Sequence, residues 1–233
     1  MNFFGMIEIG KEIERFLNQG QPITKLLDGR VLTYEKVRVM GIMNITPDSF
    51  YEGSRLTNPD IALKRAEKML SEGADILDIG GESTRPGSNP IVGNDERARV
   101  FPVITRIRKE FPEAIISVDT WRSDTADGAI ACGADIINDI TALEGDKRIS
   151  NVIRRTKVPT ILMHMRGTPQ NMQTKCEYRN VVDEVACYLK ERAIYAESLG
   201  LSKESIILDP GIGFAKNVEQ NLLLMRDLHT LTS

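Results

Sequence analysis

The stretch VRVMGIMNITPDSF, residues 37–50, shows the pattern from which the fold of this chain is predicted. It begins as an apolar run rich in β-branched residues, which is typical of a strand that is buried on both faces. It ends in a polar segment with turn-forming residues, among them Asn44, Thr46 and Asp48. A buried strand that opens directly into such a segment predicts a loop at the mouth of a functional site.

Five further apolar runs follow, and they alternate with longer segments in which apolar residues recur at helical spacing. Strands that are apolar on both faces and alternate with helices predict parallel βα units that are covered on both sides. We therefore predict an α/β fold with six βα units in one domain, residues 37–233. The predicted strands lie within 37–45, 75–81, 115–120, 135–140, 160–165 and 206–212, and the clearest helices within 58–74, 95–111, 124–134 and 180–200.

Residues 1–36 lie outside this repeat and are predicted to form an N-terminal extension. Within it, residues 10–20 are expected to form a short helix. Residues 23–35 are expected to form a β-hairpin that turns at Asp28 and Gly29, because an Asp-Gly pair favours a hairpin turn.

The composition limits the classes of partner. The chain has 233 residues and a net charge of -3, so it has no broad positive field with which to bind nucleic acid or a membrane surface. Cys132, Cys176 and Cys187 are odd in number and lack the spacing of a metal site, which favours a reducing compartment. No long apolar segment precedes Glu8, so we expect neither a signal peptide nor a spanning helix, and a cytoplasmic location.

Polar side chains follow every predicted strand, at the end where parallel sheets gather their ligand-binding residues. Any one of them could simply cap the next helix. Their joint occurrence is what predicts a binding site at the carboxyl ends of the strands. They are Asn44, Thr46 and Asp48; Glu82, Ser83, Thr84 and Arg85; Asp119; Asn138 and Asp139; His164 and Arg166; and Asp209.

The motifs MGIMNITPDSF, DIGGESTRPGS, SVDT, NDI and LDPGIGF, in this order, resemble those of dihydropteroate synthase. The resemblance spans about residues 37–229 and implies a (β/α)₈ TIM barrel. It also implies a transferase of folate biosynthesis, which is a target of sulfonamides. That enzyme joins para-aminobenzoate to 6-hydroxymethyl-7,8-dihydropterin diphosphate and releases pyrophosphate, with Mg²⁺ as its cofactor.

The resemblance also implies roles for individual residues. Asp119, Asn138 and Asp209 would bind the pterin ring, and Asp119 would stabilise positive charge on the pterin methylene. Met163 and Phe214 would contact the ring, although residues of these types at these places fit plain packing as well. Asn44 would bind Mg²⁺. Thr84, Pro86 and Phe50, with Arg85, would bind para-aminobenzoate. Asp48 and Arg85 would act with Asp119 in catalysis.

Four more polar residues receive weaker assignments from the sequence. Asp78 and Asp139 are expected to orient neighbouring loops rather than to act directly. Arg166 either contacts phosphate or is solvated or ion-paired, and His164 is not assigned to catalysis.

The sequence departs from the family after LDPGIGF, where the barrel would continue with two further βα units. The lysine, arginine and histidine that the family carries there have no counterpart, which suggests a truncated sequence or completion by another chain. Six strands also leave two open edges, at 37–45 and 206–212. A homodimer is possible, since the family is usually dimeric. Two alternatives stay open, a pterin-binding methyltransferase domain and a non-catalytic pterin-binding relative.

Overall fold

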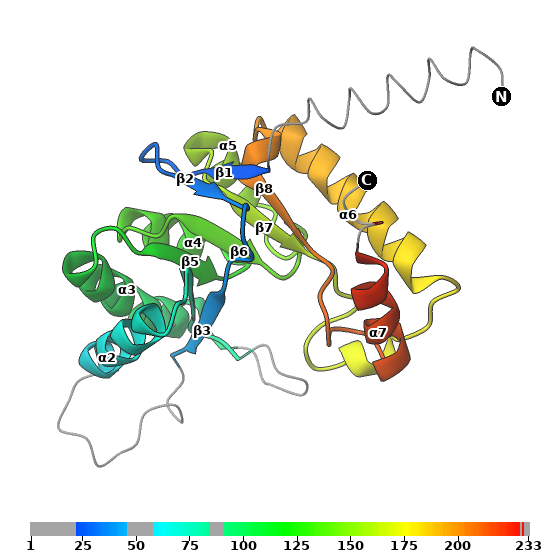
Figure 1. Ribbon diagram of the computed structural model, residues 1–233, viewed down its shortest axis with the longest axis horizontal. Helices are drawn as coiled ribbons and strands as arrows, with labels where there is room; N and C mark the ends of the chain where they lie inside the picture. Colours follow the sequence, from blue (N-terminus) through cyan, green and yellow to red (C-terminus); the bar gives the residue numbers. More distant parts are fainter. Residues whose placement is uncertain (1–21, 46–57, 84–90, 229, 231–233) are drawn as a thin grey trace.

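The computed structural model describes residues 22–45, 58–83, 91–228 and 230 (Figure 1). The described part begins with an antiparallel hairpin of β1 (Ile23–Lys25) and β2 (Val31–Thr33). Gly29 adopts a left-handed conformation with φ 90° in the turn, so the predicted hairpin is confirmed. The helix expected over residues 10–20 lies outside the described residues.

A six-stranded parallel sheet follows, and its strands lie side by side in the order of the chain. All six strands predicted from the apolar runs are confirmed. The first and last strands form the two edges of the sheet, as expected. The strands are β3 (Met40–Asn44), β4 (Ile76–Gly80), β5 (Ile115–Asp119), β6 (Ile136–Asp139), β7 (Thr160–Met163) and β8 (Ile206–Asp209).

One α-helix follows each strand of this sheet, which gives the six predicted βα units. The sequence did not single out α5, because its eight residues make little more than two turns and give too short a periodic pattern. The helices are α2 (Asn58–Ser71), α3 (Gly93–Glu110), α4 (Ser123–Ala131), α5 (Ile149–Thr156), α6 (Val181–Ser198) and α7 (Val218–Arg226), with short 3₁₀ turns at η2 (Met172–Thr174) and η3 (Lys203–Ser205).

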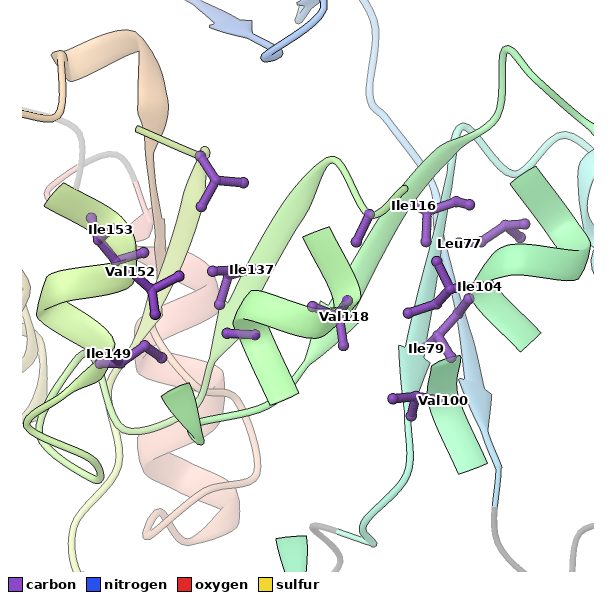
Figure 2. Close-up of a cluster of buried hydrophobic side chains, with 14 of the residues drawn as sticks. Leu77, Ile79, Val100, Ile104, Ile116, Val118, Ile137, Ile149, Val152 and Ile153 are labelled. Carbon is purple, nitrogen blue, oxygen red and sulfur yellow. The ribbon is translucent and has the colours of Figure 1, made fainter. Parts of the chain in front are cut away.

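The main hydrophobic core lies between the sheet and its helices. Figure 2 shows Leu77 and Ile79 of β4 beside Val100 and Ile104 of α3, and all four side chains are fully buried. Each such side chain contributes about 1.5–3 kcal/mol by leaving water. Because side chains alternate along a strand, Asp78 and Gly80 face the opposite, inner side of the sheet.

A second cluster closes the inner side of the sheet at the end where the strands begin. Leu26 and Leu32 of the hairpin pack against Ile76, Ile136 and Ile161, and Figure 1 shows the hairpin lying across this end. The inner face is thus filled with apolar side chains at its amino end. The polar residues that end the strands lie above this cluster, at the opposite end.

Candidate active site

Three polar residues of the predicted site lie in one row across the sheet, near the carboxyl ends of their strands. Asn44, Gly80, Asp119 and Asn138 are successive Cα partners on β3, β4, β5 and β6. Paired residues of adjacent parallel strands project to the same face of a sheet. The register therefore brings the side chains of Asn44, Asp119 and Asn138 to the same level of the inner face.

Gly80 leaves open the space between two of these side chains. A β carbon at Gly80 would lie 3.3 Å from Oδ2 of Asp119 and 3.5 Å from Oδ1 of Asn44. Both oxygens therefore border the same point above β4. A larger residue at position 80 would fill this point, so glycine keeps the carboxylate and the amide accessible to a ligand.

Asp78 lies beneath this row and orients one of its members. It is 4% exposed, and its Oδ2 accepts a hydrogen bond of 3.1 Å from Nδ2 of Asn138. With its amide nitrogen held by Asp78, Asn138 presents its Oδ1 as an acceptor, and this buried atom has no hydrogen-bond partner among the described residues. Asp78 thus orients the side chain of Asn138 and not a neighbouring loop, which differs from the prediction.

The carboxylates of the inner face share an acidic environment. Burial raises the pKa of Asp119 well above its usual range, and the nearby carboxylates of Asp78 and Glu96 raise it further. Burial also raises the pKa of Asp78 and of Asp209. A cation or a ligand rich in N–H donors would relieve this repulsion, so the electrostatics of the site favour such a ligand.

Met163 and Asp209 end the two neighbouring strands β7 and β8 and are paired in register. Met163 is buried but belongs to none of the hydrophobic clusters among the described residues. Oδ1 of Asp209 accepts a 2.7 Å hydrogen bond from the amide of Gly211. Gly211 has φ 67°, and a β carbon there would lie 2.1 Å from the carbonyl oxygen of His164. Only glycine fits this turn, which fixes the direction of the Asp209 carboxylate.

Lys216 is a buried residue that the sequence analysis missed. Its Nζ donates hydrogen bonds to the carbonyl oxygens of Gly211 (3.0 Å) and Phe214 (2.8 Å), and it lies 3.0 Å from Nδ1 of His164. Burial lowers the pKa of Lys216 to about 8. Lys216 therefore holds half-buried Phe214 and the turn after Asp209 against the end of β7. A single lysine after GIGF carries no periodic or spacing signal that would have indicated this.

Two other assignments concern the contacts of a side chain. Arg166 forms an ion pair of 2.6 Å with Glu184 and lies over the ring of Tyr178, as the ion-pair alternative predicted, and its contact with phosphate stays a prediction. Asp139 accepts hydrogen bonds from the backbone amides of Thr141 and Leu143 and so orients the loop after β6, as predicted.

The remaining predicted residues lie outside the part of the chain that the structure describes. They are Thr46, Asp48, Phe50, Thr84, Arg85 and Pro86. Across the described ranges there is no group of three or more His, Cys, Asp or Glu residues that could hold a metal ion, and Asn44 supplies a single amide oxygen. No helix within those ranges is both long and apolar enough to cross a membrane.

A comparison with protein families shows the family to which this fold belongs. The family described as pterin binding enzyme matches residues 40–233. The chain belongs to the pterin binding enzyme family. Its relatives in this family include dihydropteroate synthase of Clostridium beijerinckii, 41% identical over 197 residues, which cover 84% of this chain and 70% of that protein. The enzyme of Bacillus subtilis is 44% identical over 194 residues, covering 83% of this chain and 65% of that protein.

Solved structures of pterin binding enzymes agree with the fold. Dihydropteroate synthase of Xanthomonas albilineans with 4-aminobenzoic acid has a TM-score of 0.82 and 39% identity, over 91% of this chain and 74% of that one. The Yersinia pestis enzyme in a sulfonamide drug complex has a TM-score of 0.80 and 37% identity, over 88% of this chain and 74% of that one. The resemblance to dihydropteroate synthase and the TIM-barrel type of fold, with six βα units in this chain, are confirmed.

Proposed function

We propose that this chain carries out the dihydropteroate synthase reaction, the condensation of 6-hydroxymethyl-7,8-dihydropterin diphosphate with para-aminobenzoate. The observation that supports this most directly is the row of Asn44, Asp119 and Asn138 at the carboxyl ends of adjacent strands, with Asp209 two strands further along. The segments that carry these residues resemble motifs of dihydropteroate synthase, and relatives of the chain are named dihydropteroate synthase. The relatives' names also favour this reaction over the methyltransferase alternative.

The pterin ring would bind edge-on to the inner face. A pterin presents N–H donors on its amide and amidine edge, and the site offers acceptors at Asp119, Asp209 and Oδ1 of Asn138. Asn138 would be a selective acceptor because Asp78 fixes its amide. Met163 and Phe214 would supply apolar contact to the ring faces.

Asp119 would act on the charge that develops in the reaction. The bond between the pterin methylene carbon and the diphosphate oxygen breaks, and the amine of para-aminobenzoate forms a new C–N bond and loses a proton. As the diphosphate leaves, the methylene carbon gains positive character. An ionised carboxylate in a site of low dielectric stabilises that charge more than water does.

Asn44 would hold Mg²⁺ on the diphosphate side of the site. Its amide oxygen is of the hard oxygen class that Mg²⁺ prefers, and it borders the same space as Asp119. When bound, the ion would supply neutralisation of charge on the leaving diphosphate.

Para-aminobenzoate would bind at the segments that follow β3 and β4. We assign Thr84, Arg85, Pro86 and Phe50 to this substrate, and Asp48 together with Arg85 to the arrangement of the reacting groups. Residues 37–233 would form the catalytic domain and 1–36 its N-terminal extension. A homodimer is also proposed, and sedimentation velocity would test it.

Calorimetry and a coupled pyrophosphate assay test the function. We expect the pterin diphosphate to bind more tightly with Mg²⁺ than without it, and pyrophosphate to appear only after para-aminobenzoate is added. Tight binding without turnover would instead indicate the non-catalytic pterin-binding relative. A chain that binds neither substrate would contradict the proposal.

A further inference from the structure

Three residues of the turn after β8 have a left-handed backbone conformation. They are Gly211 with φ 67°, Gly213 with φ 86° and Ala215 with φ 51°. This conformation is unfavourable for a residue with a β carbon, so at Ala215 it persists only where the surrounding structure holds it. The turn that carries Phe214 therefore depends on contacts from outside its own backbone.

Lys216 supplies such contacts from inside the fold. It is 3% exposed, and its Nζ donates to the carbonyl oxygens of Gly211 (3.0 Å) and Phe214 (2.8 Å) and to Nδ1 of His164 (3.0 Å). An ammonium has three N–H groups, and these three contacts account for all of them. One side chain thus ties both parts of the turn to the residue that follows β7.

The two tied positions adjoin residues that the proposed function assigns to the pterin. The amide of Gly211 donates a 2.7 Å hydrogen bond to Oδ1 of Asp209, so the place of Gly211 sets the direction of this carboxylate. Phe214 is half-buried, and its own carbonyl group is held by Lys216. Loss of the Lys216 contacts would therefore displace an acceptor for the ring and an apolar contact of the ring together.

The charge of Lys216 also acts on Asp209. Burial raises the pKa of Asp209, whereas the Gly211 amide and the positive charge of Lys216 lower it. The ammonium therefore favours the ionised carboxylate, which is the form that accepts hydrogen bonds from a pterin. Within the described ranges, the other titratable or charged groups that face Asp209 or Lys216 are Asp78, His164, Arg166 and Cys176.

We propose that Lys216 is a positioning residue for the pterin ring, which holds Asp209 and Phe214 where they contact the ring and favours the charged form of Asp209. This inference rests on the proposed function, which assigns both residues to the pterin. Lys216 itself touches no substrate in this scheme. Its effect is confined to binding of the ring, so its loss should raise the Kd of pterin ligands and leave kcat nearly unchanged.

Separate measurements on the ring and on the diphosphate test the proposal. Calorimetry would compare the full chain with its Lys216→Met variant, with the pterin diphosphate, the pterin alcohol without diphosphate, and inorganic pyrophosphate with Mg²⁺ as the probes. The Kd of both pterin ligands should rise about tenfold, as for loss of one hydrogen bond to the ring. The Kd of pyrophosphate, the KM for para-aminobenzoate and kcat should change by less than about twofold. An unchanged pterin Kd, or equal weakening of pyrophosphate, would overturn the proposal.

Lys157→Met is the matched control. Lys157 also donates from Nζ to a backbone carbonyl, that of Leu199 at 2.8 Å, but it precedes β7 at the opposite end of the sheet. This variant should bind every probe as the wild type does, even where it is less stable. A comparable loss of pterin affinity in the control would mean that the effect comes from general destabilisation, and the positioning role would be wrong.

The pH dependence of pterin binding is a readout that a merely structural role would not change. Without the nearby cation the carboxylate of Asp209 takes up a proton more readily, so in Lys216→Met the pterin Kd should begin to rise at a higher pH as the solution is acidified. Lys216→Gln keeps N–H donors but no charge. It serves if Lys216→Met does not fold, and it should show the same shift in pH with a smaller rise in Kd. Profiles parallel to that of the wild type would contradict the proposal.

Hydrogen exchange separates this inference from the proposed function. The amides of Gly211 and Phe214 should exchange faster in Lys216→Met than in the wild type, whether or not a ligand binds, because both belong to the turn that Lys216 holds. Faster exchange in a chain that binds no pterin would leave the anchoring of the turn intact and overturn the function. Faster exchange with unchanged pterin affinity would overturn the positioning role alone.

Discussion

Nζ of Lys216 lies 3.0 Å from Nδ1 of His164, although both side chains are basic. An ammonium can only donate, so the imidazole accepts through Nδ1 and remains neutral. Burial lowers the pKa of His164 to about 3, and the positive charge of Lys216 contributes to this shift. The pair joins the end of β7 to the turn after β8, next to Asp209.

Replacing Lys216 by methionine should lower the free energy of unfolding by about 2 kcal/mol, because the carbonyl groups of Gly211 and Phe214 lose their buried donor. Urea denaturation would measure this. Lys147→Met, at an exposed lysine, is the control and should change little. Equal stability of the two variants would show that Lys216 does not hold the turn.

His164 should make the protein less stable in acid. Its pKa is about 6.5 in the unfolded chain and about 3 in the folded one, so the unfolded chain takes up the proton first as the pH falls. The stability that His164 contributes while neutral is therefore lost between pH 6.5 and pH 3. The raised pKa values of Asp78 and Asp119 act in the opposite direction, because there the folded state binds the proton more tightly.

A comparison with His164→Gln isolates this contribution, since glutamine can still accept from Lys216 but does not titrate. The free energy of unfolding of the wild type should fall relative to that of the variant as the pH drops from 6.5 towards 3. Parallel pH profiles would mean that His164 titrates alike in both states.

Asp119→Asn should lower kcat by about 10²–10³-fold while weakening pterin binding by no more than about tenfold, because the lost charge acts mainly on the developing cation. The raised pKa of Asp119 also predicts that kcat/KM of the wild type falls with decreasing pH at a higher pH than for an ordinary aspartate. The variant should lack this fall. Asp127→Asn, at a solvent-exposed ion pair, is the control. Equal losses in binding and kcat would argue against the assigned role.

Gly80→Ala should weaken pterin diphosphate and Mg²⁺ binding by about tenfold, because the new methyl group would crowd Asp119 and occupy the space that Asp119 and Asn44 border. Gly41→Ala is the matched control on the neighbouring strand, where the added methyl meets the Met69 sulfur on the helix-facing side. Calorimetry should show unchanged binding in the control. Normal binding by Gly80→Ala would mean that the ligand does not occupy this space.

The order of the strands and helices could be predicted from the sequence, because the patterns that indicate strands, helices and turns are local. Apolar runs such as residues 75–81 predict buried strands by composition, and Asp28 with Gly29 predicts a turn by backbone preference. The same patterns placed Asn44, Asp119 and Asn138 at strand ends. The sequence did not indicate the short helix α5, because two turns give too little periodicity to recognise.

Tertiary structure alone decided which of these residues meet. Strand register aligns Asn44, Gly80 and Asp119. It depends on packing between whole βα units, so it cannot be predicted from the sequence of any one segment. The same holds for Lys216 at His164 and for Arg122 at Glu82, since a charged side chain can be buried only where a distant partner satisfies it. The sequence by itself thus determined the strands and the polar residues that end them. The packing of those strands determined the site that these residues form.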